Sequence, residues 1–177
     1  MNSKKDRTVL RTVRISQQLD NLLQKDAKAN RQSLNALVAT ILTKYAEWDR
    51  YMEKFGYISL TRTTFKAILE SADKEKLDRI AERVGARIPK EIMLFWFKEL
   101  SVATFLSYVS LFCTYGQVAE YELETDGKNY TLTGHHDLGE KWSNFLRQFL
   151  EQGMRSALGI TPRVEVGENS VIAKFQG

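Results

Sequence analysis

A short run of β-branched residues near the amino terminus constrains the fold more than any other feature of this chain. Residues 8–15 read TVLRTVRI, and Val13 and Ile15 alternate there with Thr12 and Arg14. This pattern predicts a short strand. The sequence predicts no second strand in the same module, and a lone strand leaves backbone groups unpaired along both edges. We therefore expect this segment to pair antiparallel with the same segment of a second copy, about a twofold axis.

Two amphipathic helices are predicted to follow this strand. Ser16 is a favourable N-cap, and the helical spacing after it predicts a helix that ends at about Ala29. Ser33 is a second favourable N-cap, and the helix that it begins has the clearest periodicity in the chain. The apolar positions of the two helices are Leu19, Leu22, Leu23 and Ala27, then Leu34, Leu37, Val38, Ile41, Leu42 and Tyr45.

The basic charge of the chain is concentrated at the same end. The formal net charge is +4, but residues 1–31 alone carry +5, so the rest of the chain carries −1. Such a distribution is expected where the amino-terminal end meets a polyanion such as DNA. Charge alone leaves open the alternative of a solubilising basic tail.

The order of these elements, with the residues RTVRIS and the interhelix turn NRQSLN, resembles the ribbon-helix-helix family of DNA-binding proteins. The resemblance covers residues 8 to about 48. It implies a homodimer whose two-stranded ribbon enters the major groove of double-stranded DNA, with Val13 and Ile15 on the buried side. It also implies two sets of DNA contacts, namely base contacts from Leu10, Thr12 and Arg14, and phosphate contacts from Arg11, Lys28, Arg31, Ser33, Leu34 and Asn35.

The sequence departs from the family pattern in the interhelix turn and at the start of the strand. The interhelix turn lacks the glycine that the family often has, although Asn30 tolerates the left-handed backbone conformation that glycine would supply. Leu10 is unusual as a base-facing residue, and Arg11 is unusual on the inward face. A strand that begins only at Thr12 would instead leave Leu10 and Arg11 in an arm that contacts phosphates.

A helical connector is predicted over residues 51–88. Gly56 is a candidate helix end, and the following residues YISLT suggest a short strand before Thr61 caps the helix RTTFKAILES. Asp73 then caps a highly charged helix, whose end we expect to be bracketed by Gly85 and Pro89.

The most apolar part of the chain follows, over residues 89–113. Lys98 and Glu99 interrupt it, and the uncharged remainder, residues 100–113, is shorter than the roughly 20 residues that cross a bilayer. A buried core helix or a dimer-interface helix is therefore the preferred interpretation. The first residues also lack the apolar region of a secretory signal, so we expect the protein in the cytoplasm.

Residues 89–177 are predicted to form an α+β domain that supports dimerisation or senses a signal. Alternating residues on either side of Asp126-Gly127-Lys128 predict a β-hairpin, and a helix is expected from about Asp137 to Gly159. Residues 162–166 and 170–175 are then expected to form a final strand pair. The whole chain is thus predicted to be α+β, with a ribbon-helix-helix module at residues 1–50 joined by the connector to this domain.

The chemistry-bearing residues predict no enzyme and no cofactor. His135, His136 and Asp137 suggest a metal site, but adjacent histidines usually point apart and no third ligand has a recognisable spacing, so no metal is expected and Asp137 is interpreted as a helix cap. Cys113 is the one cysteine and is expected to be a buried apolar residue.

Aromatic residues at helical spacing are expected mainly to form a packed core, and the alternative is that they line a pocket for an apolar effector. These residues are Phe95, Trp96, Phe97, Phe105, Tyr108, Phe112, Trp142, Phe145 and Phe149.

These features favour a homodimeric transcriptional regulator that binds specific double-stranded DNA. One alternative is an antitoxin that neutralises a toxin protein, although antitoxin tails are typically short and disordered until bound. Another is an architectural protein that coats DNA without sequence preference. The ratio of specific to random DNA binding over a salt series separates that alternative from a regulator.

Overall fold

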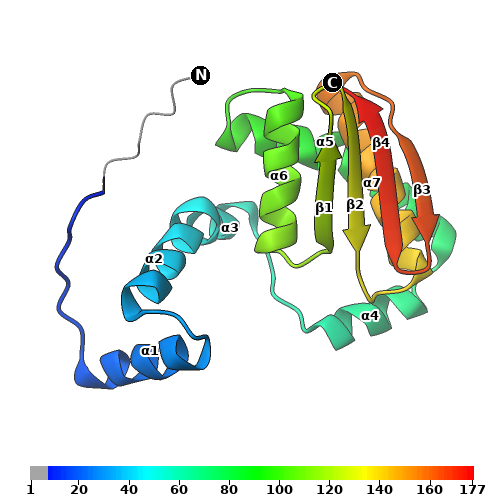
Figure 1. Ribbon diagram of the computed structural model, residues 1–177. Helices are drawn as coiled ribbons and strands as arrows, with labels where there is room; N and C mark the ends of the chain where they lie inside the picture. The colour runs from blue at the N-terminus through cyan, green and yellow to red at the C-terminus, as the bar shows by residue number, and fades with distance from the viewer. Residues whose placement is uncertain (1–7) are drawn as a thin grey trace. The chain divides into compact units, whose positions relative to one another are not determined.

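The computed structural model describes residues 8–177 and shows an α+β protein (Figure 1). Helices come first along the chain, and the four strands of an antiparallel sheet lie toward the carboxyl end. The chain divides into two compact units, of which the first ends at Tyr51 and the second is Met52–Gly177. Each unit is described by itself.

The first unit contains two capped helices, as the sequence predicts. Helix α1 is Gln17–Ala29, and the Ser16 side chain accepts a hydrogen bond from the Leu19 amide at 3.2 Å. Helix α2 is Leu34–Lys44, and the Ser33 side chain accepts one from the Ala36 amide at 3.1 Å. Both predicted N-caps are confirmed, because each hydroxyl satisfies one of the amides that a helix start leaves without a partner.

The turn between α1 and α2 adopts the left-handed conformation at a different residue from the one that the sequence suggests. Arg31 has φ = 52°, whereas Asn30 has φ = −89°. The Asn30 side-chain amide donates to the Asp26 carbonyl at 2.9 Å. Asn30 is therefore the C-cap of α1, and Arg31 makes the turn.

Residues 8–15 form no strand in the single chain, and all of them are exposed. The physical reason is that residues 8–51, the described part of the first unit, contain no strand that could satisfy their backbone groups. The expected pairing with a second copy is a property of a dimer, so it stays a prediction.

The helical path continues beyond α2 through a π-helical turn, η1, at Tyr45–Asp49 and through α3 at Arg50–Phe55. Gly56, with φ = 67°, ends it as expected. The strand predicted immediately after Gly56 is wrong, because residues 57–61 have no regular secondary structure. Thr61 caps α4, Arg62–Ser71, as predicted.

The second unit is built on two hairpins laid side by side. Strands β1, Glu120–Thr125, and β2, Asn129–His135, form the first, while β3, Arg163–Gly167, and β4, Ser170–Gln176, form the second. All pairs are antiparallel, and β2 pairs with β4 to give the order β1-β2-β4-β3. Both predicted hairpins are confirmed.

Helix α5 is longer than the sequence indicates. It runs over Lys74–Trp96 without ending at Gly85 or Pro89, and Pro89 is buried within it. Both residues lie against α7, Glu140–Leu158. A Cβ on Gly85 would lie 2.8 Å from the backbone of Phe149, and one on Gly153 would lie 3.1 Å from the Pro89 ring. The expected helix end is therefore wrong, because Gly85 and Pro89 allow a close approach of two helices.

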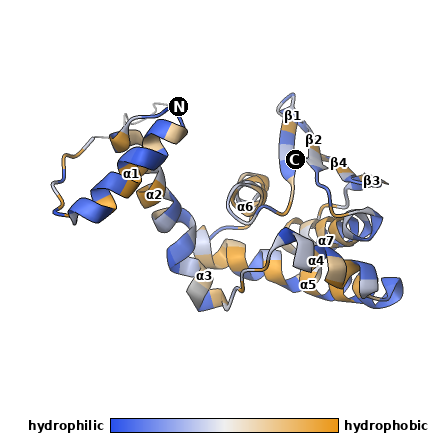
Figure 2. Cartoon of the chain, turned by 90° about the horizontal axis from the view of Figure 1, so that it is seen from below, coloured by the Kyte–Doolittle hydropathy of each residue, from blue (hydrophilic) through white to orange (hydrophobic). Residues whose placement is uncertain are grey.

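The apolar segment 89–113 forms parts of two helices and not one. Helix α5 ends at Trp96, and α6, Val102–Thr114, begins at Ser101 with a capping box that includes Thr104. Figure 2, in which hydrophobic residues are orange, shows such residues along α5 and α6. The buried core of the unit joins α5, α6 and α7 to the sheet and includes Ile92, Met93, Phe105, Leu132, Met154, Val171 and Ala173. Within residues 8–177, every helix is too short or too polar to span a bilayer.

Candidate functional site

The three residues expected to read DNA bases lie together on the segment before α1. Leu10, Thr12 and Arg14 are all exposed, and Leu10 is 90% exposed. Arg11, expected at a phosphate, lies on the same segment, where its guanidinium contacts the Leu10 carbonyl at 3.5 Å. These side chains are therefore accessible to a partner, but their final orientation depends on whether the segment pairs.

Five of the six expected phosphate contacts gather around the turn between α1 and α2. Lys28 lies in the last turn of α1, Arg31 makes the left-handed turn, and Ser33, Leu34 and Asn35 form the start of α2. The amides of a first helical turn point outward along the helix axis and favour an anion. Two cations beside such a helix start make a local arrangement that suits a backbone phosphate.

The apolar faces of the first unit are largely uncovered. Among residues 8–51, only Ala27 and Trp48 are buried, and α2 contains no buried residue at all. The uncovered side chains include those expected to face inward, and the large hydrophobic residues exposed here are Val9, Leu10, Val13, Ile15, Leu19, Leu22, Ile41, Leu42 and Tyr45. A module of this size without a core of its own is not expected to be stable alone.

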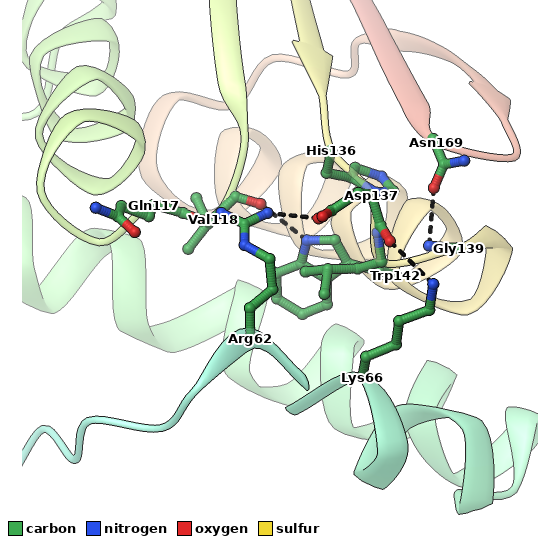
Figure 3. A network of polar contacts seen from close by, with 10 residues as sticks. Arg62, Lys66, Gln117, Val118, His136, Asp137, Gly139, Trp142 and Asn169 are labelled. Carbon is green, nitrogen blue, oxygen red and sulfur yellow. Dashed lines mark hydrogen bonds and ion pairs between the residues drawn. The ribbon is translucent and has the colours of Figure 1, made fainter. Parts of the chain in front are cut away.

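A polar network in the second unit lies beside His136 (Figure 3). Arg62 on α4 donates to the Asp137 carboxylate at 2.5 Å and to the Gln117 carbonyl at 3.3 Å. Lys66, one turn further along α4, donates to the Asp137 carbonyl at 3.3 Å. The hydrogen bond from Arg62 lowers the pKa of Asp137. Asp137 therefore binds two side chains of α4 and does not cap α7, whose N-cap is Gly139.

His136 is held in one tautomer by its neighbours. Its Nδ1 atom accepts from the Leu138 amide at 3.3 Å, and its Nε2 atom lies 3.0 Å from the Ser143 hydroxyl. Because that hydroxyl donates its only hydrogen to the Glu168 carbonyl at 3.1 Å, Nε2 must carry the proton. A second proton, on Nδ1, would displace the Leu138 amide.

The environment of His136 lowers its pKa below the ordinary value of 6.5. Burial is the main cause, and the positive charges of Arg62 and His135 act in the same direction, while Asp137 opposes them. The unfolded chain therefore binds a proton at a pH where the folded chain does not, so protonation favours unfolding.

We expect the free energy of unfolding of the second unit to be at its full value above about pH 6.5 and to decrease as the pH falls toward the lowered pKa of His136. His136→Gln should flatten this pH dependence, whereas His135→Gln, at the other histidine of the chain, removes only a minor contribution to the lowered pKa of His136 and should change the pH dependence much less. Urea denaturation at several pH values between 5 and 7.5 measures both slopes, and equal slopes in the two variants would contradict the assignment.

The described residues contain no group of three or more histidine, cysteine, aspartate or glutamate side chains placed to hold a metal ion. Cys113 is partly buried, and burial raises the pKa of its thiol to about 11. It therefore behaves as a neutral, largely apolar side chain at physiological pH.

The predicted aromatic set is divided between a cavity and the core. Five of the nine residues line one cavity, which lies entirely within the second unit: Tyr108, Phe112, Trp142, Phe145 and Phe149. Phe105 is buried in the core, and Phe95, Trp96 and Phe97, at the end of α5, do not line the cavity. Sequence analysis missed Arg62 in the adjacent polar network, because nothing near residue 62 indicates its partner 75 positions later.

Comparisons with known proteins assign no family to this chain. No protein-family model matches it, and no curated protein sequence matches it. The geometry of the two units therefore carries the functional argument alone.

Proposed function

We propose that this protein is a homodimeric transcriptional regulator that binds specific sequences of double-stranded DNA. In this proposal, residues 8–15 of two copies pair as an antiparallel ribbon, which lies in the major groove above the helices of both copies. The observation that carries the proposal is the uncovered apolar surface of the first unit, whose helices are capped and formed but bury almost nothing.

A second copy of the module supplies what the single chain lacks. Burial of a valine or leucine side chain contributes roughly 1.5–3 kcal/mol, and the exposed residues Val13, Ile15, Leu19 and Leu22 are each present twice in a dimer. Pairing the two segments also satisfies backbone groups of residues 8–15, for which the described residues of the same unit offer no strand. Dimerisation through this surface would therefore bury the exposed apolar side chains and pair the backbone groups of residues 8–15.

DNA is the partner that suits the outer side of such a ribbon. Alternation places Thr12 and Arg14 opposite Val13, and an arginine can make a bidentate contact to guanine. The start of α2, flanked by Lys28 and Arg31, suits a phosphate at the edge of the groove. The net charge of +5 over residues 1–31 also favours binding to a polyanion such as DNA.

Selection from random duplexes tests this proposal directly. We expect enrichment of a short palindromic site, a dimer in solution, and affinity for the selected site that exceeds affinity for random DNA by at least roughly 1,000-fold across a salt series. An architectural protein would show no such ratio. A protein that binds neither selected nor random DNA would refute the proposal, and an antitoxin role would then be the alternative.

Arg14→Ala is expected to relax sequence discrimination. The loss of one base contact should reduce the preference for the selected site by roughly 1–3 kcal/mol while the dimer stays folded. Arg11→Ala should instead weaken binding to all sequences about equally, since a phosphate contact carries no sequence information. Titrations of matched and mismatched duplexes measure both effects, and an unchanged preference in Arg14→Ala would show that another residue reads the bases.

A further inference from the structure

The second unit contains an apolar cavity that the proposed function does not use. It has a volume of about 270 Å³ and lies between α5, α6, α7 and the sheet. Aromatic rings from α6 and α7 line it together with aliphatic residues such as Ile88 and Leu132. The cavity is partly open to solvent, so a small molecule could enter it without unfolding of the unit.

Among the residues that the structure describes, no charged side chain lines this cavity. The indole nitrogen of Trp142 donates to the Val118 carbonyl at 3.0 Å, so its polar atom is satisfied elsewhere and its ring can face an apolar ligand. Burial raises the pKa of Tyr108 and of Cys113, which keeps both neutral. Water molecules would find few hydrogen-bonding partners here, so the cavity is suited to an uncharged apolar occupant.

A second, polar hollow adjoins the cavity. Cys113 and Ala119 line both spaces, and the polar hollow is also lined by Arg62, Gln117, Glu120 and His135. The charge of Arg62 is compensated by Asp137 at 2.5 Å, so this hollow offers hydrogen bonds without a large excess of one charge. It is therefore suited to a neutral polar substituent at one end of an apolar molecule.

We propose that the second unit binds a small, uncharged aromatic molecule, with its rings among Tyr108, Phe112, Trp142 and Phe149 and a hydrogen-bonding substituent beside Ala119. This site would be a further binding function, and it stands whether or not the first unit binds DNA. Aromatic lining favours flat rings, and the absence of charged groups in the lining excludes a strong preference for an ion.

Binding of 2-naphthol to the full-length protein tests the proposal, because this probe has two fused rings and one hydroxyl. We expect saturable binding by calorimetry with a micromolar dissociation constant, and at least tenfold weaker binding of the anion 2-naphthalenesulfonate. Failure of 2-naphthol to bind, or equal binding of the sulfonate, would overturn the proposal. A cavity that is already filled by side chains of a second copy would give the first of these results.

Two matched variants locate the site. Ala119→Leu inserts a larger side chain at the cavity wall and should weaken 2-naphthol binding at least tenfold. Ala157→Leu makes the same change at an equally buried alanine, 8% exposed, that does not line the cavity, and it should leave the affinity within about twofold. Equal effects of the two variants would refute the location.

A measurement on the unmodified chain guards against variants that fail to fold. Cys113 is the one cysteine and lines the cavity, so bound 2-naphthol should slow its alkylation by iodoacetamide at least threefold. An unchanged alkylation rate at saturating 2-naphthol would place the ligand elsewhere and overturn the proposal.

Discussion

Val13→Glu is expected to convert the dimer into a monomer and to abolish specific DNA binding. In the single chain Val13 is 75% exposed, so a glutamate there costs nothing within one subunit. In the proposed ribbon Val13 faces inward, and the substitution removes two buried valines and places two carboxylates near the twofold axis. The predicted effect therefore exists only if the two segments pair.

The expected size of this effect follows from burial. Two valines contribute together at least about 3 kcal/mol, and a factor of ten in affinity corresponds to about 1.4 kcal/mol. The dimer dissociation constant should therefore rise by at least roughly 100-fold before the cost of burying the carboxylates is added. Light scattering over a concentration series measures the dimer, and titration with the selected duplex measures binding.

Thr12→Glu is the matched control for this prediction. It introduces the same carboxylate one position earlier, on the outer side of the ribbon, so the dimer should remain while the charge repels DNA. A Val13→Glu protein that stays dimeric and binds DNA normally would refute the ribbon. A Thr12→Glu protein that dissociates would reverse the assignment of the two faces.

Gly85→Ala is expected to have the largest effect on the stability of the second unit. The new Cβ would lie 2.8 Å from the Cα and carbonyl oxygen of Phe149, and backbone atoms cannot rotate away. Helices α5 and α7 would have to separate along their whole contact. Overpacking of this kind costs roughly 1–3 kcal/mol and occasionally more, and it should outweigh the gain of about 1 kcal/mol from replacing glycine by alanine in a helix.

Gly153→Ala is the control at the same helix contact. Its Cβ would lie 3.1 Å from the Cγ atom of Pro89 and at an ordinary 3.5 Å from the Gly85 carbonyl oxygen, and a proline ring can shift by a few tenths of an ångström. We expect its free energy of unfolding to remain within about 1 kcal/mol of the original protein, since the helix propensity of alanine offsets the crowding. Urea denaturation compares the two variants, and a Gly85→Ala protein as stable as Gly153→Ala would contradict the proposed close approach.

Local signals in the sequence predicted most of the secondary structure correctly. Ser16, Ser33, Thr61 and Asp73 each cap a helix in the structure, and each signal depends only on residues within one turn. The hairpin at Asp126 to Lys128 is equally local, because the Asp126 carboxylate accepts hydrogen bonds from the backbone amides of Lys128 and Asn129. Such features form wherever the neighbouring residues allow them.

The sequence-based predictions are wrong mainly where a contact with a distant segment outweighs the local preference of the residues. Gly85 and Pro89 normally end helices, but the close packing of α7 compensates for the loss of helix propensity. Asp137 has a residue type that caps helices, but Arg62 binds its carboxylate instead. The strand expected after Gly56 does not form, and residues 57–61 have no regular secondary structure.

The sequence by itself determined the α+β class, both hairpins, the starts of the four helices capped by Ser16, Ser33, Thr61 and Asp73, and the basic charge of the amino-terminal segment. The tertiary structure alone decided that α5 and α7 are in close contact, that Arg62 meets Asp137, and that five aromatic residues from two helices surround one cavity. The physical reason is range: caps and turns depend on hydrogen bonds between neighbours, whereas packing and cavities depend on side chains that only the folded chain brings together.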